Sequence, residues 1–157
     1  LVGSEMCIRD RNMSLRLIIL STFLFVLPLN AVKYDKLNPN ALYERAIKYL
    51  DKEDYSRAIR ALKSYTKSEP EDADGWNLYA FAHRKVGKFE KADEFYKKSL
   101  ALDPNNLSAL EYQGELFVQT GMMDLAEINL NKLKELCTGS CLEYEKLKEY
   151  ISNDASK

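Results

Sequence analysis

Two cysteines near the C-terminus are the residues of this chain whose spacing most directly suggests chemistry. Cys137 and Cys141 are separated by a Thr-Gly-Ser segment. A disulfide between them would close a small loop and stabilise the fold by about 2 kcal/mol. Thiol–disulfide exchange is the alternative, although it more often uses two intervening residues. Zinc is less favoured, because two thiolates need two further ligands and the sole histidine, His83, lies far away along the chain.

No other group of residues has the pattern of a catalytic or cofactor site. The serines and aspartates fit no nucleophile motif, and the sequence contains no glycine-rich phosphate loop. Tyr49 and Phe117 stand at the same interval before and after His83, so we expect His83 to be packed in the core rather than to act as a general base. The sequence therefore predicts a protein that is not an enzyme and that has no cofactor and no metal site.

The interval around His83 recurs throughout the chain. Ala58, Ala92 and Ala126 are spaced 34 residues apart, which is the period of a helix–turn–helix repeat. Bulky and small residues recur at the same interval of 34 residues. The three sets are Leu42, Trp76 and Leu110; Ala46, Ala80 and Gly114; Leu62, Tyr96 and Leu130. Large residues at helical spacing, with a small residue in each helix, are what two antiparallel helices need to approach closely.

The repeated residues identify a family resemblance. Those of the middle window are Trp76, Tyr79, Ala80, Gly87, Phe89, Ala92, Tyr96 and Pro104. They resemble the signature of the tetratricopeptide repeat, which implies an all-α solenoid of three helix-turn-helix repeats plus a C-terminal capping helix. One departure is Glu53, which replaces the turn glycine found at Gly87 and Gly121. A left-handed backbone without glycine costs about 1 kcal/mol, so we expect the first turn to adopt another geometry.

The predicted domain organisation has eight segments. They are a linker or adapter translation artefact (1–12), a signal peptide (13–31), an N-terminal linker (32–38), three repeats (39–72, 73–106 and 107–140), a capping helix (141–152) and a tail (153–157). Lys148 indicates the cap, because it stands where Ala46, Ala80 and Gly114 stand, and smallness is needed there only when a partner helix follows. A disulfide at Cys137 would fix the angle at which this helix approaches the stack.

An export signal is predicted at residues 13–31. Met13 is followed by a basic residue, Arg16, and by an apolar run from Leu17 to Leu29, with cleavage expected after Ala31. The run is short and contains Pro28, so a secreted chain without a transmembrane segment in its mature form is favoured over an uncleaved membrane anchor. We expect the bacterial periplasm, an oxidising compartment. Without Cys7, which lies in the excluded segment 1–12, the mature chain keeps two cysteines, and an even number favours a disulfide there.

Charge argues against nucleic acid as a partner. The formal net charge of the 157 residues is −1, and no block of basic residues interrupts the sequence. Phosphate binding requires a positive electrostatic footprint, which such a sequence lacks. A protein or peptide partner is expected instead.

The resemblance also implies where a partner would bind. In tetratricopeptide repeats the first helix of each unit lines a concave groove that receives a peptide segment. The corresponding residues are Asn40, Tyr43 and Ile47; Asn77, Phe81, Arg84 and Lys85; Glu111 and Glu115. The groove is expected to be apolar at one end, basic in the middle and acidic at the other end. Arg84 and Lys85 are interpreted either as contacts for an acidic partner or as solvated charges at the groove edge.

Chaperone-binding members of the family hold a C-terminal carboxylate with a clamp of Lys, Asn and Arg side chains. Tyr43, Ile47 and Leu78 occupy three of those positions here, so this clamp is absent. We therefore expect a non-catalytic adaptor of the cell envelope that binds a partner segment in its groove. The alternatives are a thiol-active envelope protein that uses Cys137 and Cys141, or a self-assembling scaffold whose groove is occupied by a second copy.

Overall fold

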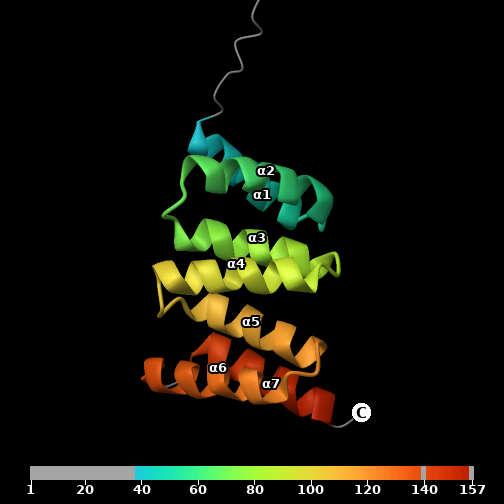
Figure 1. Ribbon diagram of the computed structural model, residues 1–157, viewed down its shortest axis with the longest axis vertical. Coiled ribbons are helices and arrows are strands. Elements are labelled where there is room, and N and C mark those ends of the chain that lie inside the picture. The colour runs from blue at the N-terminus through green and yellow to red at the C-terminus, as the bar shows by residue number, and fades with distance from the viewer. Residues whose placement is uncertain (1–37, 139–140, 156–157) are drawn as a thin grey trace, which may run out of the picture. The chain divides into compact units, whose positions relative to one another are not determined.

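The computed structural model describes residues 38–138 and 141–155, which contain seven α-helices and no strand (Figure 1). The helices are α1 (Pro39–Leu50), α2 (Tyr55–Ser68), α3 (Ala73–Lys85), α4 (Phe89–Leu102), α5 (Leu107–Gln119), α6 (Met123–Leu136) and α7 (Leu142–Ala155). The expected linker artefact at 1–12, the signal peptide at 13–31 and most of the linker at 32–38 lie outside the described residues.

Side-chain caps define where several helices begin. Asn38, which precedes Pro39 at the start of α1, accepts a hydrogen bond from the backbone N–H of Asn40 at 3.1 Å. Asn106 accepts one from the N–H of Ala109 at 2.9 Å at the start of α5. Such a cap stabilises a helix by about 1 kcal/mol because it satisfies an N–H that has no partner within the helix.

The helices form three successive pairs, α1 with α2, α3 with α4 and α5 with α6, and each pair packs on the next. The small residues expected at the contacts, including Ala46, Ala80 and Ala92, have no exposed surface. Gly114 of α5 is the tightest of these contacts, since a Cβ atom there would lie 2.5 Å from the side chain of Leu147. The predicted all-α repeat solenoid is confirmed.

The last helix, α7, packs on both α5 and α6 as a cap. It begins at Leu142 and ends at Ala155, beyond the expected end at 152 and inside the expected tail. Neither proline nor glycine occurs in that final turn to stop the helix. Its inner face buries Leu147 completely, whereas Lys148 is exposed, as expected for the end of a stack.

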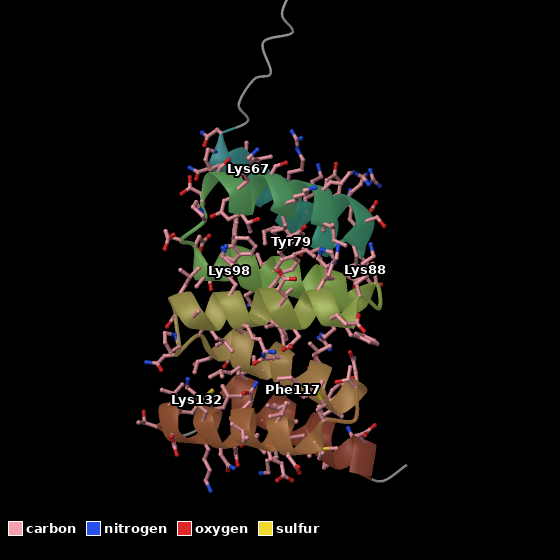
Figure 2. The ribbon with its side chains drawn as sticks, viewed as in Figure 1. Lys67, Tyr79, Lys88, Lys98, Phe117 and Lys132 are labelled. Atoms are coloured by element: carbon pink, nitrogen blue, oxygen red, sulfur yellow. A yellow bond between two sulfur atoms is a disulfide. The ribbon has the colours of Figure 1, made fainter. Side chains whose placement is uncertain are left out.

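Aromatic packing dominates the contact between the first two pairs. In Figure 2 Tyr79 lies where α3 faces the first pair. Its ring stacks on Phe95 with centroids 4.4 Å apart and meets His83 edge-on at 4.7 Å. His83 is 3% exposed, so its predicted core position is confirmed. Burial, with smaller contributions from the charges of Lys88 and Lys91, lowers the pKa of His83 to about 4.

The first interhelical turn has the geometry of the other two, contrary to expectation. Glu53 has a φ of 54°, in the left-handed region shared by Gly87 and Gly121 at 74°. The N–H of Asp54 donates to the carbonyl of Tyr49 at 2.9 Å, as the N–H of Lys88 donates to the carbonyl of His83 at 2.9 Å. Packing of the helix pair thus imposes the same turn on a residue that disfavours it.

Replacing Glu53 with glycine should therefore stabilise the protein. We expect Glu53→Gly to raise the free energy of unfolding by about 0.5–1 kcal/mol, because glycine adopts the positive φ without a steric penalty. Urea denaturation followed by circular dichroism measures this change. Gly87→Ala is the matched control and should destabilise, since open space surrounds Gly87 and the effect there is confined to the backbone. A less stable Glu53→Gly variant would contradict the argument.

Candidate peptide-binding groove

All nine residues predicted to line the groove lie on α1, α3 and α5, the first helix of each pair. Helix α3 contacts α5 directly, and α5 contacts α7. Asp74 of α3 lines a common hollow with Asn40 and Tyr43 of α1, so residues of all three first helices lie along one side of the stack. The predicted groove residues therefore follow one another along this side in the order of the repeats.

The α1 end of this side has two adjoining hollows. One is about 390 Å³ and is lined by Tyr43 and Ile47 together with charged residues of α1. The other is about 290 Å³ and is lined by Asn40 and Tyr43 together with Tyr65 and carboxylates that include Asp72 and Asp74. Burial, and then the charges of Asp74 and Asp72, raise the pKa of Tyr43. The hollow at Tyr43 and Ile47 thus has an apolar lining with charged residues of both signs, whereas the charged residues of the other hollow are acids.

Rings and one exposed cation form the middle of the predicted groove. Phe81 lies 5.0 Å from Tyr112 of α5 and 6.2 Å from Tyr55 of α2, measured between ring centroids. The Nζ atom of Lys85 lies 5.7 Å from the Tyr55 ring and 5.9 Å from the Phe81 ring. Tyr55 and Tyr112 are absent from the predicted groove residues, because the spacing within one helix does not show which rings of neighbouring helices meet Phe81.

Arg84 lies beneath the rings in a buried ion pair. Its Nη2 atom is 2.5 Å from the Oε2 atom of Glu115, and the residue is 5% exposed. Its guanidinium carbon lies 5.6 Å from the Phe81 ring and 5.9 Å from the Tyr112 ring. Arg84 is therefore not a solvated charge at the groove edge, and Glu115 already neutralises it in the protein described. A charge reversal at Arg84 would place two carboxylates together in a buried site and disturb folding.

Two more of the nine predicted residues are buried. Asn77 is 4% exposed, and its Oδ1 atom has no hydrogen-bond partner among the described residues. Glu111 is 2% exposed and lies 3.7 Å from the Nζ atom of Lys146, which α7 contributes. Burial is the main cause that raises the pKa of Glu111 to about 7; Lys146 opposes the shift, and the charges of Glu115 and Glu143 add to it. Asn77 and Glu111 are therefore packed inside the stack and, contrary to expectation, are not accessible to a partner segment.

The two cysteines stand where α6 ends and just before α7 begins. Cys137 is the C-cap residue of α6, and Cys141 directly precedes Leu142 of α7. Their Cα atoms are 5.5 Å apart, a separation that a disulfide accommodates. The bond itself stays a prediction. Among the described residues no group of three or more His, Cys, Asp or Glu side chains is arranged to hold a metal ion.

Comparison with known proteins agrees with the repeat geometry. The tetratricopeptide repeat family model matches residues 73–106, which are α3, α4 and the turn that follows. Residues 73–106 therefore form a tetratricopeptide repeat. Its fold is similar to the TPR2B domain of yeast Sti1, solved in a complex with a pHsp70 peptide. That domain is 19% identical, with a TM-score of 0.69 and coverage of 75% of this chain and 96% of the other.

Two further similarities extend over parts of this chain. The first such repeat of Spaghetti (RPAP3), bound to an HSP90 peptide, has a TM-score of 0.67 at 20% identity and covers 78% of this chain and 99% of the other. The mitochondrial import receptor subunit TOM70 of Rattus norvegicus is 33% identical over 79 residues. That match includes 50% of this chain and only 13% of the receptor. Within residues 38–138 and 141–155, no helix is long and apolar enough to cross a membrane.

The buried carboxyl of Glu111 predicts a pH-dependent stability. Its folded pKa lies above the unfolded value of 4.5, so the folded protein binds more protons and loses stability as the pH rises from about 4.5 to about 7. We expect Glu111→Gln to be more stable than the wild type by roughly 1–3 kcal/mol above pH 7 and equally stable below pH 4.5. Urea denaturation across this pH range measures the difference.

Glu149→Gln is the control for this measurement, since Glu149 is exposed on α7. It controls for the loss of one carboxylate at an exposed site. A Glu111→Gln variant whose stability relative to the wild type does not change with pH would contradict the assigned burial of a protonated carboxyl.

Proposed function

We propose that this protein is a non-catalytic adaptor that binds an extended segment of a partner protein along α1, α3 and α5. Tetratricopeptide repeats act as protein interaction modules, and the geometry of α3 supports that role here. The observation that carries the proposal is the exposed Lys85 beside a partly exposed cluster of Phe81, Tyr55 and Tyr112. An apolar anchor and a charged group at one site are the features that fix a peptide's position and register.

The rigid base under these rings strengthens the proposal. The ion pair of Arg84 with Glu115 joins α3 to α5 below Phe81 and Tyr112. A partner side chain that packs on the rings therefore meets groups already held in place, and binding costs less conformational entropy. Lys85 is exposed and makes no ion pair among the described residues, so a carboxylate of the partner is the complementary group.

The chemistry expected of the partner differs from a C-terminal carboxylate held in a clamp. Two similar domains carry chaperone peptides according to their names, but the likeness, at 19% and 20% identity, is one of fold. Tyr43 and Ile47 stand at clamp positions here, and Arg84 is engaged by Glu115. We therefore propose an internal segment with an apolar residue followed or preceded by an acidic one.

We also propose that the adaptor works in the cell envelope, most simply the bacterial periplasm. The support is the signal-like segment at 13–31, which lies outside the described residues. An oxidising compartment would keep Cys137 and Cys141 paired, so that the disulfide restrains α7 as a cap over Gly114.

Site-specific photocrosslinking tests the groove. A photoreactive residue at position 85 should crosslink a partner in cells, whereas one at Lys91, an exposed residue of the second helix of the pair, should not. With that partner purified, Phe81→Ala and Lys85→Glu should each weaken binding about tenfold in calorimetry, because each removes an anchor of the site.

Lys91→Glu is the matched control and should bind as the wild type does. Thermal unfolding of each variant shows that the fold is intact. Unchanged affinity in both Phe81→Ala and Lys85→Glu would refute the groove assignment. Light scattering of the purified protein identifies the alternative in which a second copy is the captured partner.

A redox titration separates the structural disulfide from the thiol-active alternative. We expect Cys137 and Cys141 to have a reduction potential below about −300 mV, as structural disulfides resist the glutathione pool. Alkylation of free thiols in glutathione buffers, followed by mass spectrometry, measures the potential. Replacing both cysteines with serine should lower the melting temperature and leave partner binding unchanged. A potential close to −200 mV would favour thiol exchange instead.

A further inference from the structure

The end of the stack formed by α1 and α2 differs from the contacts inside it. Inside the stack, Tyr79 and Phe95 of the second pair pack against the first pair, and their stacked rings have centroids 4.4 Å apart. In the third pair the same two positions are Gln113 and Asn129, which are buried and hydrogen-bonded at 3.2 Å. In the first pair they are Arg45 and Ala61.

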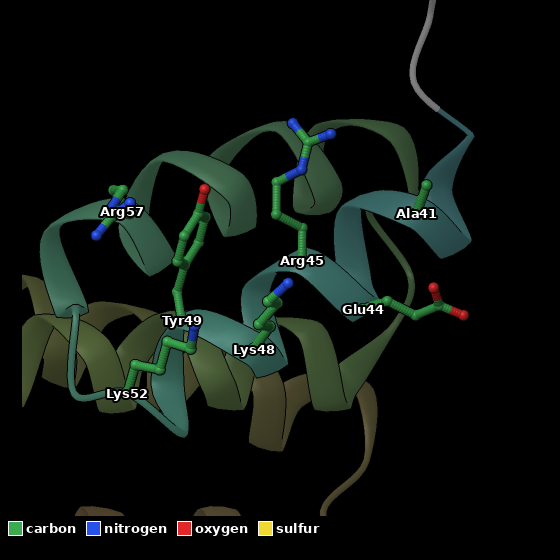
Figure 3. Close-up of a pocket in the computed structure, with 7 residues that line it drawn as sticks. All are labelled: Ala41, Glu44, Arg45, Lys48, Tyr49, Lys52 and Arg57. Carbon is green, nitrogen blue, oxygen red and sulfur yellow. The ribbon is translucent and has the colours of Figure 1, made fainter.

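This exchange hollows the outer face of the first pair, which has no described helix packed on it (Figure 1). Ala61 replaces an aromatic ring with a methyl group, and a hollow of about 190 Å³ lies there between Leu42, Tyr49 and Ala61. A second hollow of about 500 Å³ adjoins it and shares Arg45, Tyr49 and Arg57. Figure 3 shows the Tyr49 ring between the side chains of Arg57 and Arg45.

The rim of these hollows carries positive charge. Arg45, Lys48, Lys52 and Arg57 line the larger hollow, against one acid, Glu44. Arg57 is paired with Asp54 and lies over the Tyr49 ring, 4.9 Å from its centroid. The other three cations form no ion pair among the described residues. Such an excess of positive charge is unusual for a face that serves only to keep the end of a stack soluble.

The opposite end of the stack provides the comparison. Helix α7 mixes Glu145, Lys148 and Glu149 on its exposed surface, and Lys148 lies 3.7 Å from Glu145. Solubility alone is therefore served there by interspersed charges of both signs. The α1–α2 end has instead a hollow, an aromatic floor and unpaired cations, which together are the features of a recognition surface.

We propose that this end face, defined by Arg45, Lys48, Tyr49, Lys52 and Ala61, binds an acidic segment of a protein that carries an apolar side chain among its carboxylates. Arg45 lies on α1 and Lys52 lies seven positions later, in the turn after α1, where the C-cap Asp51 still has helical dihedral angles. At the helical rise this separation is roughly 10 Å. A lone anion cannot engage both cations, whereas about three residues of extended chain span that distance. The apolar side chain of the segment fills the space beside Tyr49 that Phe95 occupies one repeat later.

Charge complementarity favours an acidic protein segment over a nucleic acid. The chain as a whole has a net charge of −1, and the end face presents four cations. A nucleic acid carries a phosphate on every nucleotide and would extend beyond these four side chains, where no further block of basic residues in the sequence meets it. A short acidic segment meets the cations without extending that far.

Fluorescence anisotropy with the full chain tests this site. The probe is a labelled peptide Glu-Asp-Phe-Glu-Asp, compared with its uncharged counterpart Gln-Asn-Phe-Gln-Asn. We expect the acidic peptide to bind at low salt, and the uncharged one to bind at least tenfold more weakly. The combined variant Arg45→Glu and Lys52→Glu should weaken binding of the acidic peptide about tenfold or more, because both attractions become repulsions.

Two further variants isolate charge from shape. Lys63→Glu with Lys67→Glu makes the same change of charge on exposed positions of α2 outside the hollows, and its affinity should stay within about twofold of the wild type. Ala61→Phe fills the hollow with the residue that the second repeat uses and should weaken binding without changing the charge. Circular dichroism reports whether the Ala61→Phe variant folds. If it does not fold, the comparison of the Arg45 and Lys52 variant with the Lys63 and Lys67 variant tests the site.

Several outcomes would overturn the proposal. They are an absence of binding to the acidic peptide, equal binding of the two peptides, unchanged affinity in the Arg45 and Lys52 variant, or tighter binding of a single-stranded oligonucleotide at matched salt. Lys48 and Lys52 also line the hollow of Tyr43 and Ile47, whereas Phe81 and Lys85 line neither hollow of the end face. Phe81→Ala and Lys85→Glu should therefore leave binding of the acidic peptide at the end face unchanged, which distinguishes failure here from failure of the groove assignment.

Discussion

Close approach of neighbouring helices at small residues is the constraint on which the rest of this structure depends. Ala46 and Ala80 are completely buried, and a Cβ atom at Gly114 would collide with Leu147 of α7. Such contacts set the distance between helices, and that distance brings side chains of α3 and α5 within reach of each other. The ion pair of Arg84 with Glu115 exists because α3 and α5 are held that close.

The same packing decides which charged residues of the predicted groove are exposed. Arg84 and Lys85 are neighbours in sequence, yet one is 5% exposed and paired while the other is exposed beside aromatic rings. Successive residues on a helix point about 100° apart, so one turns under the rings and the other turns outward. Lys85 is therefore the exposed cation of the predicted groove, and the carboxylate of Glu115 is neutralised by Arg84.

The two ends of the stack follow from the absence of a described neighbour on one side of each. At α7 the outer surface is mixed in charge, and Lys148 replaces the small residue of the repeats. At α1 and α2 the aromatic packing residues of the second repeat are replaced by Arg45 and Ala61, which leaves a hollow with a positive rim. Residues that depart from the repeat pattern at the two ends of the stack are thus not needed for packing against a neighbouring pair.

The sequence by itself determined the helical repeat, its period, the caps at Asn38 and Asn106 and the core position of His83, because these depend on local spacing and on capping chemistry. It also assigned groove residues to the correct helices. Only the tertiary structure decided that Arg84, Asn77 and Glu111 are buried, that Tyr55 and Tyr112 join Phe81, and that Glu53 takes a left-handed backbone. These outcomes depend on contacts between repeats, where the energy of packing outweighs local preference, and a single helical register does not contain that information.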